Sequence, residues 1–394
     1  MILGMTKNIK VVKILLVDDS PVALIVLKRV FATSSEIEVV GTAQHGLEAL
    51  ELIPQLQPDV ICTDLHMGFM NGLEFTREVM QKYPTPILVI SNSVQDHDTH
   101  NVFQLLEAGA VDVFPKPETG FPSDYEGVTK ALINKIKILS GVKVFTQYSR
   151  HKITEHNQHK LIQNQATQRV EIPHKNSTLN RQNKPSKNSH LTSPHSVSRH
   201  HQVSKIIKVV AIGASTGGPQ ALKTIINDFP SNFPLPIICV QHISKGFLTG
   251  LVNWLGYESK LPVKIAKSGE LPRPGVIYFP PEEHHLELSN TGKFVCSKTL
   301  LIGGHCPSIT VTFNSVANFY GLFAAGILLT GMGRDGADGM LAIAQAKGLT
   351  IAQDEATSVI FGMPKEAIAL GAAQYILPIT SITPFLQNYL NKNR

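Results

Sequence analysis

Residues 208–219 read Lys-Val-Val-Ala-Ile-Gly-Ala-Ser-Thr-Gly-Gly-Pro, a short apolar run that ends at a serine between glycines. A helical pattern follows from Gln220, so the stretch predicts a strand, a sharp turn and a helix. Residues 213–217 fit G-x-S-x-G, the pattern that exposes a serine hydroxyl at the end of a strand. The glycines permit a tight turn and a close approach of the helix to the strand. Ser215 is therefore the candidate nucleophile.

The alternation of strand and helix patterns continues through residues 205–394, which predicts a Rossmann-like α/β domain with a mostly parallel sheet. The ends of parallel strands lie at one edge of such a sheet, where ligands bind. Strands are expected at 209–213, 236–240, 263–266, 276–279, 326–330 and 350–353, a hairpin at 285–289 and 293–297, and helices at 219–227, 247–257, 308–318 and 339–346.

Three of these strands are followed by residues that can act together. Ser215 follows the first strand, His242 the next, and Asp335 lies in the glycine-rich segment after residue 330. A serine hydroxyl needs a base to attack at neutral pH, and the base needs an acid to orient it. Backbone N–H groups near Met332 and at the start of the helix after Ser215 are candidate donors to an oxyanion. The three residues predict a Ser-His-Asp hydrolase.

Other interpretations of the same residues are weaker. The glycine turn could cradle a phosphate, but it lacks the lysine of a P-loop and the G-x-G-x-x-G of a dinucleotide site. Taken singly, His242 and Asp335 are ordinary structural residues. The α/β-hydrolase order is Ser, acid, His, whereas this chain has Ser, His, Asp, which disfavours an ordinary lipase or esterase. His305 and Cys306 could form a Cys-His pair, but adjacent side chains diverge.

An earlier set of alternating patterns predicts a separate doubly wound, flavodoxin-like domain at residues 11–140. Its strands are expected at 12–17, 38–43, 60–63, 87–90 and 111–114, and its helices at 22–32, 46–52, 72–81, 99–107 and 125–139. Polar residues follow four of the five strands, namely Asp18, Asp19, Asp64, Ser91 and Lys116. Three carboxylates and an ammonium at one edge suit a divalent cation beside a phosphoryl group. The alternative is a set of solvated turn residues.

The segment between the domains, residues 141–204, is rich in His, Asn, Gln, Ser and Lys, and we expect a flexible linker there. Residues 149–205 carry a net charge of +8 and the whole chain +6, so the remainder carries −2. The predicted domains are therefore almost neutral, which argues against nucleic-acid binding. At 394 residues the chain is too long for one core.

Four scattered cysteines and the lack of an apolar run of about 18 residues predict a cytoplasmic protein that is not embedded in a membrane.

The first predicted domain resembles the receiver domain of bacterial response regulators. The stretches that carry the resemblance are 16–20, 63–65, 70–75, 89–91 and 114–117. The resemblance implies that a histidine kinase phosphorylates Asp64, with Mg²⁺ held by Asp18, Asp19, Asp64 and the backbone carbonyl of His66. Ser91 and Lys116 would then bind the phosphoryl oxygens. The family usually has Met-Pro after the acceptor and Asp-Gly further on, where this chain has Gly68 and Asn71.

The second predicted domain resembles the catalytic domain of chemotaxis protein-glutamate methylesterases. The matching stretches are 212–219, 240–243, 269–270, 329–337, 353–355 and 361–367. The resemblance assigns the triad to Ser215, His242 and Asp335, with Thr216 and the Met332 backbone beside the reacting carbonyl. One stretch departs: the family usually has Arg-Pro-Ser-Val-Asp where residues 306–310 read Cys-Pro-Ser-Ile-Thr, so Cys306 and Thr310 replace a charge pair.

Together the two resemblances predict a serine hydrolase activated by phosphorylation. It would demethylate glutamyl methyl esters, and deamidate glutamines, on methyl-accepting chemoreceptors, and the hydrolysis itself would need no cofactor. The unphosphorylated receiver would cover the edge that bears Ser215. The alternative is a response regulator whose output domain only binds a partner.

Overall fold

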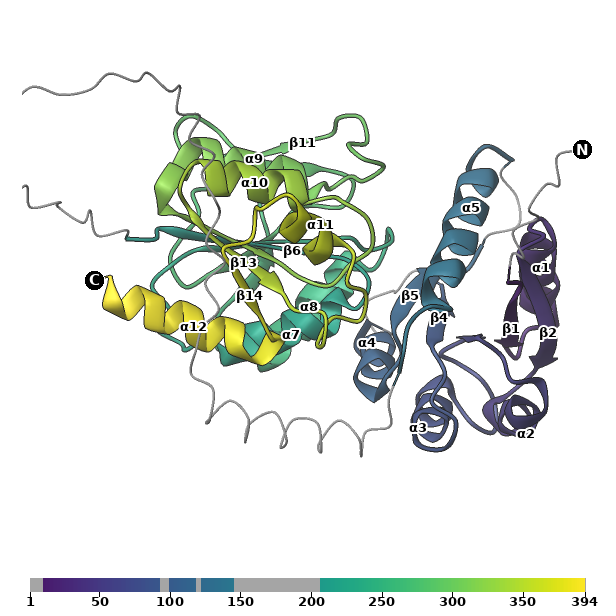
Figure 1. Ribbon diagram of the computed structural model, residues 1–394. Coiled ribbons are helices and arrows are strands. Elements are labelled where there is room, and N and C mark those ends of the chain that lie inside the picture. The colour runs from purple at the N-terminus through teal and green to yellow at the C-terminus, as the bar shows by residue number, and fades with distance from the viewer. Residues whose placement is uncertain (1–9, 93–98, 118–121, 145–205, 394) are drawn as a thin grey trace, which may run out of the picture.

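The computed structural model describes residues 10–92, 99–117, 122–144 and 206–393, which form two α/β domains (Figure 1). Almost all of the predicted linker, from residue 145 to residue 204, lies outside the described residues. The predicted fold class is confirmed, because both large sheets are parallel and carry helices on both faces.

The N-terminal domain has a five-stranded parallel sheet in the order β2-β1-β3-β4-β5. Its strands are nearly continuous apolar runs, as expected where helices cover both faces of a sheet. The elements are β1 (Val12–Val17), α1 (Pro21–Ala32), β2 (Ile37–Ala43), α2 (Gly46–Leu56), β3 (Val60–Thr63), α3 (Gly72–Lys82), β4 (Ile87–Ser91), α4 (Thr99–Ala108), β5 (Asp112–Pro115) and α5 (Pro122–Leu139).

The C-terminal domain has a seven-stranded parallel sheet in the order β14-β13-β12-β6-β7-β9-β8, and a separate antiparallel hairpin of β10 and β11. Its elements are β6 (Val209–Ala214), α7 (Gly218–Asp228), β7 (Ile237–Gln241), α8 (Leu248–Glu258), β8 (Val263–Ile265), β9 (Ile277–Phe279), β10 (His285–Leu288), β11 (Phe294–Ser297), α9 (Ile309–Tyr320), a 3-10 turn (Gly321–Phe323), β12 (Ala324–Leu328), α10 (Ala337–Gln345), β13 (Leu349–Gln353), α11 (Met363–Ala369), β14 (Tyr375–Leu377) and α12 (Ile379–Lys392).

The order of strands in this sheet decides where its site lies. The first strand, β6, is central and pairs with β7 on one side and with β12 on the other. The chain thus leaves β6 in one direction and later returns to its opposite side. Such a switch point opens a crevice at the carboxyl ends of the strands. Ser215 follows β6 and Asp335 lies beyond β12, so both are placed at this crevice.

Three C-terminal elements, α11, β14 and α12, were not predicted. Strand β14 has only three residues, which is too short for a period-two pattern. Helix α12 contains Pro384 in its interior, a residue that normally signals a helix end. Burial of Ile382, Leu386 and Leu390 on one face of α12 stabilises the helix nevertheless.

The two domains pack against each other through α4 of the first and α7 and α8 of the second (Figure 1). The ring of Phe103 stacks on Trp254, with centroids 5.3 Å apart, and the Trp254 indole N–H donates to Glu107 at 2.9 Å. Lys223 forms an ion pair with the same Glu107. Apolar side chains from both domains join in one continuous core here.

Candidate active site and phosphoacceptor site

Ser215 is held at the end of a buried strand by its own backbone. Its N–H donates to the Thr330 carbonyl at 3.0 Å, and its carbonyl accepts from the Gly218 N–H at 2.8 Å. Gly217 has φ +75°, and a Cβ there would lie 2.5 Å from Val359. Only glycine fits this turn, because a side chain would be both strained and obstructed. The turn therefore sets the serine directly before the N-terminus of α7.

His242 and Asp335 meet beside that turn. Ala214 pairs in register with Gln241, so the next residues along the two strands, Ser215 and His242, are neighbours at the sheet edge. The His242 Nε2 atom lies 2.8 Å from Asp335 Oδ2. Both side chains are largely buried, with 9% and 6% of their surfaces exposed. The fold thus brings the three predicted triad residues to one edge.

Asp335 is fixed by the start of α9. Its carboxylate accepts from the Ser308 hydroxyl at 2.8 Å, from the Ile309 N–H at 2.7 Å and from the Thr310 N–H at 3.0 Å. Burial alone would raise the pKa of Asp335, but the His242 contact and the donors of α9 hold this pKa well below its usual range. The carboxylate is therefore ionised at neutral pH and can orient the imidazole.

The other ring nitrogen of His242 has no partner. Nδ1 is buried and makes no hydrogen bond, and no hydrogen bond joins His242 to the Ser215 hydroxyl among the residues with described positions. A buried ring nitrogen without a partner is rare and costly. Catalytic hydrogen bonds are often long before substrate binds. Nδ1 is thus the atom of His242 that remains available to accept the serine proton.

Gln241 supports both Ser215 and His242, and the sequence motifs did not single it out. Its side-chain amide donates to the carbonyls of Ser215, at 2.8 Å, and of His242, at 2.9 Å. The side chain is buried and lies against Gly218, where a Cβ would be 2.0 Å from Oε1. One amide therefore joins the backbones of Ser215 and His242, the candidate nucleophile and base.

We expect Gln241→Leu to lower the turnover number about 10- to 100-fold, because the Ser215 and His242 carbonyls would lose the amide that joins them and the strand ends would shift. The measurement is the rate of ester hydrolysis at saturating substrate. Gln374→Leu is the matched control, since that amide donates to the Gly348 carbonyl at the opposite edge of the sheet. Equal rates for the two variants would contradict the role of Gln241.

Of the two residues predicted beside the reacting carbonyl, Thr216 is buried and Met332 is half exposed. The Thr216 carbonyl accepts from the Thr330 hydroxyl at 3.0 Å. The Met332 backbone packs on Gly362, where a Cβ would lie 3.1 Å from the Met332 Cα. The Thr216 carbonyl is thus held by the segment that follows β12, and the Met332 backbone lies against Gly362.

Residues 306–310 depart from the usual family sequence, and the residues present there make local contacts of their own. Thr310 accepts a hydrogen bond from the Gly336 N–H on its hydroxyl at 2.7 Å, directly beside Asp335. Cys306 is half-buried, and burial raises the pKa of its thiol. The alternative Cys-His pair is not seen, and the His305 ring stacks on His242 instead.

The predicted phosphoacceptor residues also converge. The Lys116 ammonium lies 2.8 Å from Asp18 Oδ2 and 2.8 Å from Asp64 Oδ2. Oxygens of Asp18, Asp19 and Asp64 all lie within 4.8 Å of one another. Ser91 is the last residue of β4 rather than the residue after it, and its carbonyl accepts from the Lys116 N–H at 2.9 Å.

The oxygen atoms of the three acids in this cluster suit a hard cation. Carboxylate oxygens are the ligands that Mg²⁺ prefers, so the three acids fit the metal that the resemblance implies. Burial raises the pKa of Asp64, and Lys116 opposes this rise. Burial alone would lower the pKa of Lys116, but its two carboxylate partners raise it. The ammonium therefore stays charged next to the acceptor.

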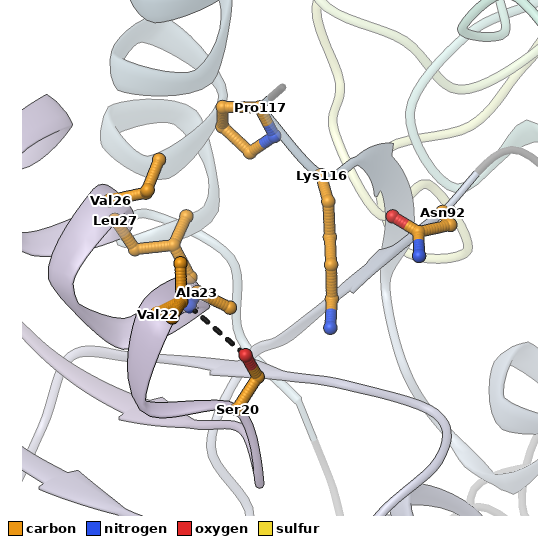
Figure 2. Close-up of a pocket in the computed structure, with 8 residues that line it drawn as sticks. All are labelled: Ser20, Val22, Ala23, Val26, Leu27, Asn92, Lys116 and Pro117. Carbon is orange, nitrogen blue, oxygen red and sulfur yellow. Dashed lines mark hydrogen bonds between the residues drawn. The ribbon is translucent and has the colours of Figure 1, made fainter. Parts of the chain in front are cut away.

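A cavity of about 490 Å³ lies beside this cluster. Figure 2 shows the residues that line it, with the Lys116 side chain among them. Ser20 begins α1 there, and its hydroxyl accepts from the Ala23 N–H at 3.3 Å. The remaining wall is mostly apolar, and the lining residues are Ser20, Val22, Ala23, Val26, Leu27, Asn92, Lys116 and Pro117. The cavity therefore adjoins the acidic cluster through Lys116, which lines the cavity and pairs with Asp18 and Asp64.

A cluster of acids with a lysine and a candidate Ser-His-Asp constellation lie in one chain, the combination expected of a hydrolase coupled to a receiver domain. Family models agree with both halves: CheB methylesterase matches residues 210–386, and the response regulator receiver domain matches residues 14–120.

Full-length relatives extend this agreement. The chain is 37% identical to a protein-glutamate methylesterase/protein-glutamine glutaminase of Nitrosospira multiformis over 377 residues, which are 96% of each protein. It is 37% identical over 375 residues to one of Syntrophus aciditrophicus, covering 95% of this chain and 97% of the relative. The solved catalytic domain of Thermotoga maritima CheB methylesterase is 39% identical and aligns with 47% of this chain and 98% of that one, with a TM-score of 0.45. The chain belongs to the protein-glutamate methylesterase/protein-glutamine glutaminase family.

None of the helices in the described part of the chain has the length and apolar character that crossing a membrane requires.

Proposed function

We propose that this protein hydrolyses the methyl esters of glutamyl side chains on methyl-accepting chemoreceptors, and deamidates glutamines there, with Ser215 as nucleophile. The observation that carries the proposal is the His242–Asp335 contact beside Ser215, with His242 Nδ1 left free. Membership of the methylesterase/glutaminase family supports the substrate class. The protein would act in the cytoplasm.

The proposed reaction has two halves, in which Ser215 is first acylated and then released by water. His242 Nδ1 takes the Ser215 proton as the hydroxyl oxygen attacks the ester carbonyl, and Asp335 stabilises the resulting imidazolium. The same proton then passes to the departing methoxide, which leaves as methanol, or to the departing amide nitrogen of glutamine, which leaves as ammonia. His242 next takes a proton from water, which attacks the acyl-serine. Returning that proton to Ser215 releases glutamate.

The negative charge that develops on the carbonyl oxygen needs donors. The proposed donors are backbone N–H groups beside Thr216 and Met332, at the start of α7 and in the glycine-rich segment before Asp335. Helix N-termini favour negative charge, and pre-oriented donors give a large share of the rate in acyl transfer.

A histidine kinase is the proposed phosphodonor, and Asp64 is the proposed acceptor. Asp18, Asp19, Asp64 and the His66 carbonyl would hold Mg²⁺, which supplies neutralising charge for the phosphoryl group. Lys116 already bridges Asp18 and Asp64 and would move to bind a phosphoryl oxygen, while Ser91 would donate its hydroxyl.

Control of activity would act through the contacts between the domains. Val359 and Ile360 of the catalytic domain pack against the apolar core of the receiver, and Val359 also lies against Gly217, next to Ser215. The positive charge of Lys135, on receiver helix α5, also helps to lower the pKa of His305 in the catalytic domain. Both observations support a receiver that covers the Ser215 edge. No gain of activity in residues 205–394 alone would contradict this control.

The direct test is the release of methanol from receptor membranes carrying methylated glutamates, with and without a small phosphodonor and Mg²⁺. The proposal predicts release that rises when both are present. A chain that binds the receptor but releases no methanol under any condition would instead be a partner-binding output protein.

Asp64→Asn is expected to abolish the response to the phosphodonor while leaving the basal rate within about twofold, because the amide cannot form the acyl phosphate. The measurement is the ratio of methanol release with and without the donor. Asp59→Asn is the matched control, since Asp59 lies at the opposite end of β3 and pairs with Lys10. Undiminished stimulation of the Asp64 variant would rule out this residue as the acceptor.

A further inference from the structure

The ring of His305 lies flat on the ring of His242. The two centroids are 3.9 Å apart, and the planes differ by 6°. Among the described residues, this is the closest and most nearly parallel ring pair in the protein. The contact covers one face of the His242 ring. Both ring nitrogens can still make hydrogen bonds, because these lie in the plane of the ring. Neither the Asp335 contact nor the free Nδ1 is obstructed by it.

Backbone hydrogen bonds hold the loop that carries His305. The backbones of Ile302 and His305 exchange two hydrogen bonds of 3.1 Å across the turn formed by Gly303 and Gly304, whose φ angles are +60° and +87°. Two glycines with positive φ are what a two-residue hairpin turn requires. This turn therefore fixes the backbone from which the His305 side chain projects.

A buried histidine anchors both ends of the same loop. His285 contacts the Leu300 carbonyl through Nε2 at 3.2 Å and accepts from the Ser308 N–H on Nδ1 at 3.0 Å. Ser308 in turn begins α9, the helix that holds Asp335. The loop of His305 and the cradle of Asp335 are thus one connected unit.

A single hydrogen bond does not fix the plane of an imidazole. The χ2 torsion of histidine is broad, so a ring held only at Nε2 can still rotate about that contact. Rotation would swing Nδ1 away from the serine. A flat neighbour whose own loop is held by hydrogen bonds restricts this rotation, because the rings keep their full van der Waals contact only when they are parallel.

We propose that His305 is a positioning residue, which holds the His242 ring in the plane where Nε2 meets Asp335 and Nδ1 faces Ser215. The inference rests on the proposed function, since it assigns His305 a role in presenting the base of that hydrolase. The ring contact of His305 is with His242, so the proposed role acts through His242.

The charge state of His305 suits this role. Burial, together with the neighbouring His242 and the more distant Lys135, lowers the pKa of His305 to about 4, against the opposing influence of Asp335. The ring is therefore neutral at neutral pH. A neutral aromatic face does not oppose the positive charge that His242 acquires during each turnover, whereas a second imidazolium 3.9 Å away would.

The test compares two substitutions in the full chain, activated by a phosphodonor with Mg²⁺. His305→Phe keeps a flat ring that cannot titrate. His305→Leu occupies a similar volume without a flat face. We expect His305→Leu to lower kcat about 10- to 100-fold with KM within about twofold, and His305→Phe to recover kcat to within about threefold. The acid-side pH at which half of the activity is lost should not change in the Phe variant.

The outcomes separate this inference from the proposed function when Ser215→Ala is assayed in parallel. An inactive Ser215 variant beside a fully active Leu variant overturns the role of His305 alone. A Phe variant as slow as the Leu variant also overturns it, because the imidazole chemistry rather than its plane would then matter. A change in KM without a change in kcat would make His305 a substrate contact. If the Leu variant does not fold, the activity of the folded Phe variant still decides the question.

Discussion

Replacement of Ser215 by alanine is expected to lower methanol release by about 10⁴-fold or more, the usual scale for a triad nucleophile. The turn and the start of α7 depend on the backbone of Ser215 and on Gly217, so the variant should fold normally. Substrate binding should also survive, because the substitution removes one hydroxyl and leaves the backbone of the site unchanged. The loss should therefore fall on kcat rather than on KM.

The matched control is Ser289→Ala, which removes a hydroxyl from the turn between β10 and β11. Its rate should equal that of the unchanged protein. Methanol release by the Ser215 variant within tenfold of the unchanged protein would exclude a covalent serine mechanism.

Asp335→Asn is expected to cost about 10⁴-fold in kcat and about 3 kcal/mol in the free energy of unfolding at neutral pH. The carboxylate accepts from the start of α9 on both oxygens and contacts His242 on one of them. An amide offers only one acceptor oxygen, so at least one buried donor would lose its partner and the His242 ring would lose its orientation.

The loss of stability depends on pH in a defined direction. Since the pKa of Asp335 is lowered in the folded protein, its contribution is fully present above the pKa of an unfolded aspartate, about 3.9, and is lost as the pH falls through the folded value. The difference in stability between the unchanged protein and the variant should shrink below about pH 4. Asp338→Asn, which breaks only the exposed pair with Arg334, is the control and should change stability by less than about 1 kcal/mol. A difference that grows toward low pH would contradict the assignment.

Much of the fold and of the triad could be predicted because the signals are local. Apolar strands that end in turn residues, followed by helical periods, determine a parallel α/β sheet, and the carboxyl ends of its strands share one edge. The placement of Ser215, His242 and Asp335 follows from this rule once β6, β7 and β12 are neighbours. The order of the strands in the sheet was not predicted, but the short connections between successive strands and helices restrict the possible orders.

The supporting shell could not be predicted, because it depends on contacts between distant segments. Gln241 looked like a strand residue, and nothing local indicated that its amide joins the backbones of Ser215 and His242. The stack of His305 on His242 requires the loop after residue 297 to fold back over the sheet edge. The change to Thr310 suggested a missing charge pair, yet its hydroxyl is used locally by Gly336.

The central claim is that Ser215 is a nucleophile whose access depends on the receiver. It is tested most directly by labelling the full chain with a fluorophosphonate and measuring the rate at which the tryptic peptide of residues 209–223 gains the adduct. The account predicts one adduct per chain, on Ser215, formed faster when a phosphodonor and Mg²⁺ are present. An adduct on another residue, or none on a protein that still releases methanol, would contradict it.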